Sequence, residues 1–371
     1  MQIYCERERL LRAFQTAASV VPARSPKAIL QNVKLETTGE GIVLTATDLE
    51  VGIRIDLGGV ETTSPGSALL PVGRVGSILR EAPDEKLTVH SDGRQVAIEG
   101  QKSKFQLPAE DPMGYPGVQA FDATVYHELP ARVFRELIRR TVFATDNEST
   151  RYALGGILLE FGEEQITAVG TDGRRLAQQV GSAKVVGGAS TVDGMTIVPS
   201  RAMHVLERAL SENDEDIQLA VHDNAVLVRS QRTTVYARLI EGRFPNWQGV
   251  FPQQDEMVKI PLVAGAFHAA VRQAAIVTSE DRRGIDFTFG DGKLEMVGHG
   301  GEFGESRVEL PVAYDGAEIR IRLDPRFVSD FLKALEPEQN MVMELKNEET
   351  AAVCRTEDGY AYVVMPLSQG Q

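Results

Sequence analysis

The chain repeats itself three times, and this repeat limits the folds that it can adopt. A word centred on proline recurs as "ALLPVGRVGSILREA", "TIVPSRAMHVLERAL" and "IRLDPRFVSDFLKAL". Its prolines, Pro71, Pro199 and Pro325, lie 128 and 126 residues apart. A second word, "TATDLEVGIRI" and "AVGTDGRRLAQQV", places Asp48 and Asp172 124 residues apart. Two independent sequence motifs that recur at nearly the same spacing indicate three related units.

Each unit shows the same order of patterns. A segment with helical spacing precedes strand-like tracts broken by glycine turns, and a second helix follows the proline before further strands. "HDNA", His222–Ala225, predicts a hairpin turn. The predicted helices are Glu6–Ser19, Val72–Glu81, Ala131–Phe143, Ser200–Ser211, Leu262–Ala275 and Pro325–Leu335. We therefore predict an α+β fold of three tandem domains, each with two helices on antiparallel sheets, at residues 1–122, 123–252 and 253–371.

Composition narrows the class of protein. Hydrophobic residues make up 42% and charged residues 25%, as in ordinary globular proteins. No segment approaches the roughly 20 apolar residues of a membrane span. The charged N-terminus lacks the apolar core of a signal peptide. Cys5 and Cys354 stand at opposite ends of the chain and make no disulfide framework. We expect a cytoplasmic protein that does not enter membranes.

Motifs for catalysis are absent from the sequence. There is no phosphate-binding P-loop, no Rossmann glycine spacing, no His-Glu-x-x-His and no Gly-x-Ser-x-Gly. The histidines are scattered, and "SENDEDIQ" (Ser211–Gln218) lacks the spacing of a calcium loop. We expect no metal, no cofactor and no enzymatic activity.

Charge is distributed unevenly along the chain. The formal net charge is -14, which by itself argues against nucleic-acid binding. Each predicted helix is nevertheless positive, and together they carry +8, so the remaining residues carry -22. If the helices line one side of an assembly, that side attracts a polyanion. No aromatic stacking platform or recognition helix accompanies the arginines, so we expect contact with a nucleic-acid backbone without base readout.

A family resemblance rests on several words in a fixed order. "TDLEVGIR", "RYALGGILLE", "TDGRRLA", "GRFPNW" and "YVVMPL" together resemble the bacterial sliding clamp, the beta subunit of DNA polymerase III, over the whole chain. The resemblance implies a head-to-tail homodimer that closes a ring around duplex DNA, with helices lining the hole. It implies a processivity factor for DNA replication. A clamp loader would place it, and it would tether the polymerase III alpha subunit, other polymerases and repair proteins through short linear peptides.

The resemblance also implies a peptide groove between the second and third domains. Arg174, Gly249 and Arg282 depart from the family's usual residues, which predicts a shallower or more basic subsite that tolerates acidic residues in partner peptides. The groove residues implied by position are Leu154, Thr171, Gly173, Arg174, Arg175, Leu176, Pro245, Val250, Phe327, Val363, Met365, Pro366 and Leu367.

Two further surfaces follow from position and charge. For DNA, the resemblance implies Arg24, Tyr152 and Arg201, and helix charge adds Arg139 and Arg7; Glu148 is an unexpected acid beside them. For the dimer seam, a basic first unit faces an acidic third unit, which is complementary charge. The seam residues are Arg74, Ile78, Lys102, Lys104, Ile276, Glu302 and Glu305.

Two other interpretations stay open. The chain could be a three-domain scaffold that binds proteins and never DNA. It could also be an enzyme that uses Asp172 and Arg175 on a phosphorylated substrate, although the sequence offers no catalytic base for it. As an isolated motif, Thr171-Asp172-Gly173 is more typical of a turn than of a binding loop.

Overall fold

A computed structural model describes residues 1–38, 41–146, 152–188, 195–210, 215–222, 224–252, 257–279 and 283–368, with Tyr152 and Glu302 described by backbone only. Tertiary contacts divide the chain into two compact units, which are described separately here. Unit 1 comprises Met1–Arg135 and Ala183–Leu239, and unit 2 comprises Glu136–Ser182 and Ile240–Gln371. Glu148 and Arg282, singled out in the sequence, lie outside the described residues.

Two antiparallel sheets form unit 1. The first has the strand order β5 (Glu61–Ser64), β1 (Gln2–Glu6), β7 (Lys86–Ser91), β8 (Gln95–Glu99) and β9 (Lys104–Pro108). The second runs β14 (Lys184–Val186), β10 (Tyr126–Pro130), β16 (Asp216–His222), β17 (Ala225–Arg229), β18 (Thr233–Arg238), β4 (Val51–Asp56), β3 (Gly41–Thr47), β2 (Asn32–Thr38) and β6 (Ser67–Pro71). The predicted hairpin at His222–Ala225 is confirmed by the pairing of His222 with Ala225.

Unit 2 also contains two antiparallel sheets. Its larger sheet includes, in order, β11 (Gly156–Phe161), β12 (Gln165–Thr171), β13 (Arg175–Ser182), β26 (Tyr360–Val364), β25 (Ala352–Arg355), β24 (Asn340–Leu345) and β19 (Val258–Val263). The smaller has the order β22 (Glu305–Pro311), β21 (Lys293–His299), β20 (Ile285–Gly290) and β23 (Ile319–Leu323). The pairing of β13 with β26 joins the second repeat to the third, as β18 with β4 joins the second to the first in unit 1.

The helices lie where their sequence signals predict. They are α1 (Arg7–Ala18), α2 (Val72–Glu81), α3 (Ala131–Thr141), α4 (Ser200–Ala209), which follows β15 (Thr196–Pro199), α5 (Ala264–Ala274) and α6 (Pro325–Lys333). The division between the units falls within α3. In α6, Asp324 caps the N-terminus by accepting from Arg326 N, and Pro325 takes the first helical position. Single turns of 3-10 helix occur at 28–31, 112–114, 142–144, 152–155, 248–250, 275–277 and 301–303.

Two predicted helix starts are wrong. The helix expected from Glu6 begins at Arg7, because Glu6 is the last residue of β1. The helix expected from Leu262 begins at Ala264, because Leu262 and Val263 pair with Met341 and Asn340 and so belong to β19. Sheet pairing here takes precedence over a helical spacing that the apolar residues also satisfy.

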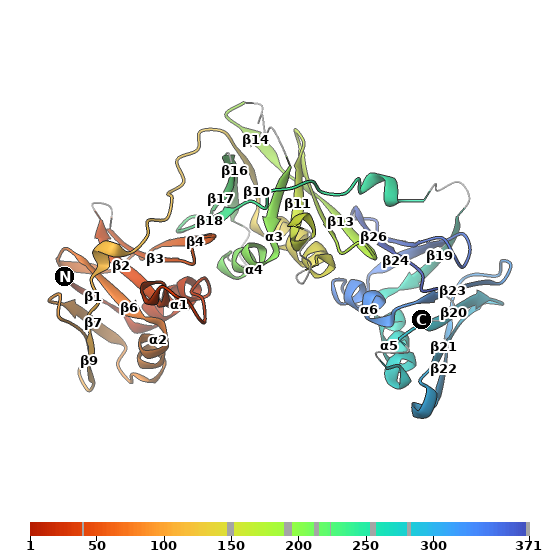
Figure 1. Ribbon diagram of the computed structural model, residues 1–371, viewed down its shortest axis with the longest axis horizontal. Coiled ribbons are helices and arrows are strands. Elements are labelled where there is room, and N and C mark those ends of the chain that lie inside the picture. Colours follow the sequence, from red (N-terminus) through yellow and green to blue (C-terminus); the bar gives the residue numbers. More distant parts are fainter. Residues whose placement is uncertain are drawn as a thin grey trace. The chain divides into compact units, whose positions relative to one another are not determined.

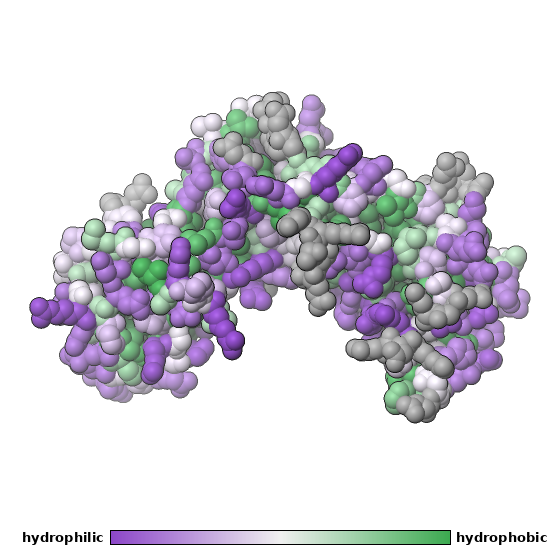
Figure 2. Space-filling model, viewed as in Figure 1, coloured by the Kyte–Doolittle hydropathy of each residue, from purple (hydrophilic) through white to green (hydrophobic). Residues whose placement is uncertain are grey.

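Helices of one repeat pack in pairs against their sheets. Contacts join α1 to α2 in unit 1 and α5 to α6 in unit 2, where Figure 1 shows the pair side by side. The core of unit 2 gathers Phe267, Phe287 and Phe331 with Tyr360 and Tyr362. Both tyrosine hydroxyls donate to backbone carbonyls, of Arg140 (2.8 Å) and Phe327 (3.0 Å), so their burial leaves no polar group unmatched. On the face shown in Figure 2, hydrophilic residues cover much of each unit, and the hydrophobic residues form small areas scattered among the hydrophilic ones.

Two absences concern the described residues alone. None of their helices has both the length and the apolar character needed to cross a membrane. No cluster of three or more His, Cys, Asp or Glu side chains among them could hold a metal ion.

Candidate functional site

The Thr-Asp word folds as a side-chain-supported turn between two strands. Asp172 Oδ1 accepts from the amides of Arg174 (2.9 Å) and Arg175 (3.0 Å), while Thr171 Oγ1 donates to the carbonyl of Arg175 (2.6 Å). Gly173 has a φ of 84°, which favours glycine. The turn thus closes the β12–β13 hairpin and places two arginines at the start of β13, beside β26.

The first repeat builds the same turn from the same residues. Asp48 Oδ1 accepts from the amides of Glu50 (3.0 Å) and Val51 (2.7 Å), and Thr47 Oγ1 donates to the carbonyl of Val51 (2.8 Å). Leu49 takes the glycine's place, also at a φ of 84°. The repeated word is therefore first of all a turn, as the isolated motif predicts.

Arg175 is fully engaged within unit 2. Its guanidinium donates to Asp172 (3.1 Å), Asp330 (2.8 Å) and the carbonyl of Phe143 (2.7 Å), and only 10% of the side chain is exposed. Burial works against the charged form, but Tyr362, Asp330 and Asp172 outweigh it and raise the pKa of Arg175. Arg175 therefore supports the wall of the predicted groove from behind, and its nitrogens are already used.

Arg174 differs from its neighbour in every respect. Its side chain is exposed, and its guanidinium lies 5.2 Å from the ring centroid of Phe327, which Arg175 also contacts at 4.4 Å. Within the described part of the chain, no carboxylate or carbonyl accepts from the Arg174 guanidinium. The buried ring of Phe327 thus lies beside two cations, one fixed and one exposed to solvent.

The C-terminal strand and tail complete this region. Leu176 pairs with Val363, Met365 N donates to the carbonyl of Arg174 (2.9 Å), and Leu367 N donates to the carbonyl of Arg322 (2.8 Å). Val363 is buried to 1% exposure whereas Met365 is 43% exposed. The structure thus brings together Thr171, Gly173, Arg174, Arg175, Leu176, Phe327, Val363, Met365, Pro366 and Leu367.

Beside this tail lies an open cavity of about 860 Å³. Met365, Pro366 and Leu367 line one side, and Arg320 and Arg322 of β23 line another. An exposed methionine next to a cavity is a surface that adapts to different apolar side chains.

Three of the predicted groove residues lie in segments outside the cluster around Arg174 and Phe327. Leu154 lies in the turn before β11, and Pro245 and Val250 lie in the segment that leads to the third repeat. No hydrogen bond or ring contact among the described residues joins them to Arg174 or Phe327. Trp247 Nε1 donates to Glu160 (3.2 Å), which holds the segment containing Pro245 and Val250 against β11.

Every helix from α1 to α6 carries a positive formal charge, between +1 and +3, with the bounds observed. The arginines predicted for nucleic acid have different surroundings. Arg24 is exposed, and Arg139 is half exposed, 3.7 Å from Glu336. Arg201 donates to Val20 O (3.1 Å) and pairs with Asp48 (2.8 Å), yet 54% of it is exposed. The Tyr152 side chain lies outside the description.

Arg7 fits the predicted role poorly. Its Nη1 donates to the carbonyl of Leu79 (2.8 Å), and its Nε is buried. The guanidinium thus joins the start of α1 to the end of α2. Its positive charge lies beside a carbonyl near the C-terminus of α2, where a cation is favourable.

Comparison with known proteins places these features in one family. Models of the N-terminal, central and C-terminal domains of the DNA polymerase III beta subunit match residues 1–119, 128–246 and 248–368. The chain belongs to the DNA polymerase III beta subunit family. It is 28% identical to the beta sliding clamps of Pseudomonas putida and Escherichia coli, over 99% of this chain and 100% of each relative.

Solved structures of beta subunits share the fold. The DNA polymerase III beta subunit of Pseudomonas aeruginosa superposes with a TM-score of 0.90 at 27% identity, and both chains are covered completely. A sliding clamp from the same organism bound to griselimycin superposes with a TM-score of 0.91 at 26% identity, again over both whole chains. The expected α+β fold of three tandem clamp domains is confirmed.

Two of the predicted seam residues lie on sheet edges. Lys104 is on β9 and Glu305 on β22, each the last strand of its sheet. Lys104 pairs within the chain with Glu99 (2.7 Å), and Glu305 lies 3.6 Å from His299. Arg74 and Lys102 are exposed, Ile78 is partly buried, and the side chain of Glu302 lies outside the description.

Sequence reasoning missed residues that act through tertiary contact. Phe303, which was not predicted, is 65% exposed close to β22, and Ile276, which was predicted, is 79% exposed after α5.

Asp330 and Phe143, which were also not predicted, hold Arg175 in place. The spacing of Asp330, three residues after Phe327 on α6, was the available signal for it, because such residues share a helix face.

Proposed function

We propose that this beta subunit is a DNA polymerase processivity factor that works as a ring-shaped sliding clamp. Two copies close head to tail around duplex DNA, and the ring tethers a polymerase by topology. The observation that carries the proposal is the tandem match of three beta-subunit domains along almost the whole chain, in which every helix is positive although the chain is acidic. We retain the division at 1–122, 123–252 and 253–371.

Duplex DNA would be held loosely and without regard to sequence. Arg24, Arg139 and Arg201 are exposed cations on or near positive helices, and Tyr152 is their expected companion. Such contacts neutralise phosphates and weaken as salt rises. Arg7, committed to Leu79, is the weakest of the DNA candidates.

Partner proteins would dock by short linear peptides on the surface around Phe327, Arg174 and Met365. That surface combines a buried aromatic ring, an exposed methionine and an exposed cation. Expected partners are the polymerase III alpha subunit, the clamp loader, other polymerases and repair proteins. The relative bound to griselimycin supports a ligand-binding capacity in this family.

The dimer seam would join β9 of one copy to β22 of its partner. Each is an edge strand, and the exposed Ile276 and Phe303 beside β22 offer apolar area to cover. We further propose that the protein has no catalytic activity of its own, needs no cofactor, and acts in the cytoplasm.

Retention on circular DNA tests the proposal. The clamp is placed on a nicked circular plasmid by a clamp loader and separated from free protein by gel filtration at high salt. Because a closed ring is held topologically, it stays on the circle and is lost when one restriction cut makes the DNA linear. A scaffold protein that binds no DNA elutes separately from both the circular and the linear DNA. A protein that binds DNA by ordinary surface contacts dissociates equally from circular and linear DNA as the salt concentration rises.

A further inference from the structure

The first strand of each repeat occupies an equivalent position. β1, β10 and β19 each end where a helix begins. The backbone amide of the first helical residue donates to the carbonyl of the residue that directly precedes the neighbouring strand, which is β7, β16 or β24. These bonds are Arg7 N to Glu85 O (2.8 Å), Ala131 N to Glu215 O (2.8 Å) and Ala264 N to Gln339 O (3.0 Å). Counting back from the helix, Lys259–Pro261 of β19 correspond to Gln2–Tyr4 and to Tyr126–Glu128.

In the first two repeats a short strand covers the other edge of this strand. β5 pairs antiparallel with β1, and β14 pairs antiparallel with β10, each over three residue pairs. Both covering strands come from the same place in their repeat, directly after β4 and β13. The covering strand is therefore a regular part of the repeat.

The third repeat lacks this strand in the part of the chain that the structure describes. β19 pairs with β24 and ends the order of its sheet. The corresponding segment, which follows β22, is tied to the β20–β21 hairpin instead. Val312 N donates to Gly292 O (2.9 Å), and Gly292 N donates to Tyr314 O (3.0 Å). These bonds hold the segment away from β19 and leave the strand's outer edge open.

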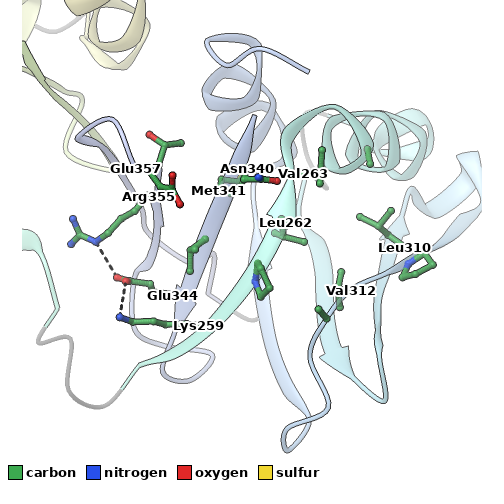
Figure 3. Close-up of a pocket in the computed structure, with 16 residues that line it drawn as sticks. Lys259, Leu262, Val263, Leu310, Val312, Asn340, Met341, Glu344, Arg355 and Glu357 are labelled. Atoms are coloured by element: carbon green, nitrogen blue, oxygen red, sulfur yellow. Dashed lines mark hydrogen bonds and ion pairs between the residues drawn. The ribbon is translucent and has the colours of Figure 1, made fainter. Parts of the chain in front are cut away.

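A cavity of about 720 Å³ lies against β19 and is lined also by residues of β24 and β25 and by Leu310–Ala313 at the end of β22. Figure 3 shows Leu310 and Val312 on one side of Leu262, and Glu344 and Arg355 on the other. Val263, 44% exposed, adds apolar surface beside β19. The volume is within the range of ligand sites, which is roughly 300–1,000 Å³.

The open edge presents backbone groups that can form a ladder. Because hydrogen bonding alternates along an antiparallel strand, and Ala264 bonds toward β24, the groups of Lys259, Pro261 and Val263 point to the open side. Lys259 and Val263 offer an amide and a carbonyl each, while Pro261 offers a carbonyl only. Proline at such an edge prevents uncontrolled pairing with long strands.

The lining of the cavity balances Lys259 and Arg355 against Glu344 and Glu357, but Lys259 supplies a cation at the strand edge itself. Arg355 Nε donates to Glu344 (3.1 Å), whose side chain is 4% exposed, so this carboxylate already has a close cationic partner. Lys259 Nζ lies 4.0 Å from Glu344, beyond hydrogen-bond length, and is 61% exposed. Lys259 is therefore placed to pair with a second carboxylate. In the second repeat the covering strand sets Lys184 opposite Glu128, a pair of opposite charges at the position that corresponds to Pro261.

We propose that the open edge of β19 binds a short extended segment of a partner protein, which adds the antiparallel strand that the third repeat lacks. The segment carries β-branched residues opposite Ile260 and Leu262 and an acidic residue opposite Lys259. This site is separate from the surface around Phe327, and its existence does not depend on the proposed ring.

The probe is the peptide acetyl-Thr-Val-Thr-Val-Glu-Gly-amide, written so that Glu falls opposite Lys259 in the register of β14 on β10. Its labelled form is titrated against the full chain by fluorescence polarisation. Amide exchange is then followed by NMR with the unlabelled peptide. We expect saturable binding and slower exchange of the Lys259 and Val263 amides, while those of Ile260 and Leu262, which face β24, change little.

Four variants make the test specific. Lys259→Pro removes an edge amide and should weaken binding about tenfold, whereas Pro261→Thr supplies one and should strengthen it several-fold. Lys259→Glu should prefer a peptide with Lys in place of Glu. Met365→Asp, in the other surface, should leave binding unchanged. Thermal unfolding of each variant confirms that it is folded.

Several results overturn the proposal. They are absence of saturable binding to the wild-type chain, equal binding by Lys259→Pro and Pro261→Thr, or loss of binding in Met365→Asp. Retention on circular DNA is unaffected by any of these outcomes, so failure here is distinct from failure of the proposed function.

Discussion

At the residue scale, adjacent arginines have opposite roles. Arg175 is buried and holds Asp172, Asp330 and a carbonyl, so its loss would leave Asp172 without its cation and Asp330 with Lys333 alone. Arg174 is exposed and touches only the face of Phe327 in the contacts recorded for its side chain. A substitution at Arg174 should therefore cost the fold little, while Arg175 cannot vary freely.

Acidic peptides should gain from Arg174. Two synthetic peptides that differ only by Asp or Asn beside the apolar anchor are titrated by calorimetry. We expect the Asp peptide to bind about two- to fivefold tighter at low salt, as for an exposed ion pair. Arg174→Gln should remove the difference, and added salt should reduce it. Equal affinity of the two peptides for the wild-type chain would refute the role.

The two cysteines make stability fall at alkaline pH. Burial raises the pKa of both Cys5 and Cys354 from 9.0 to about 12, so the folded state keeps protons that the unfolded state loses above pH 9. The contribution of the two thiols to the free energy of unfolding is fully present below pH 9. Above pH 9 it declines, by about 1.4 kcal/mol per cysteine at pH 10. Thermal unfolding from pH 8 to 11 measures this. The Cys5→Ala, Cys354→Ala double variant should show a shallower decline between pH 9 and 10.

At the scale of elements, the Thr-Asp turn closes the β12–β13 hairpin and holds Arg175 beside Phe327. Asp172→Ala should remove two amide bonds and leave Arg175 with one carboxylate fewer. We expect a loss of about 3 kcal/mol in the free energy of unfolding, as for a buried pair with one partner removed. Chemical denaturation measures it.

A matched control is available in the first repeat. Asp92 Oδ1 accepts from the amides of Arg94 and Gln95 in the β7–β8 turn in the same way, but the structure records no arginine side chain on its carboxylate. Asp92→Ala should therefore cost much less. Equal losses in the two variants would mean that the Arg175 pair adds nothing.

At the scale of the whole molecule, charge and sheet edges argue for a closed assembly. Positive helices stand in an acidic chain, and the edge strands β9 and β22 carry Lys104 and Glu305. Lys102→Glu with Lys104→Glu should weaken the homodimer, seen as a shift toward monomer in sedimentation velocity at low salt. Arg94→Glu, exposed at the other end of the β7–β8 hairpin, is the control. An unchanged dimer in the double variant contradicts a charge-complementary seam.

Local sequence patterns that recur at a fixed distance are sufficient to predict the three-fold repeat, the six helices to within a few residues, and the Thr-Asp turns. Proline, aspartate and glycine mark the same structural places in each unit. The family resemblance predicts a peptide groove that includes Phe327, and this role stays a prediction.

Only the tertiary structure decided how those residues are used. It buried Val363 and left Met365 exposed, tied Arg7 to Leu79 and Arg175 to Asp330, and left β19 without its covering strand. Each outcome depends on partners distant in sequence, whose contacts no local pattern encodes. A repeat predicts which elements form, whereas the hydrogen bonds of one segment, such as Val312 with Gly292, determine which edge stays open.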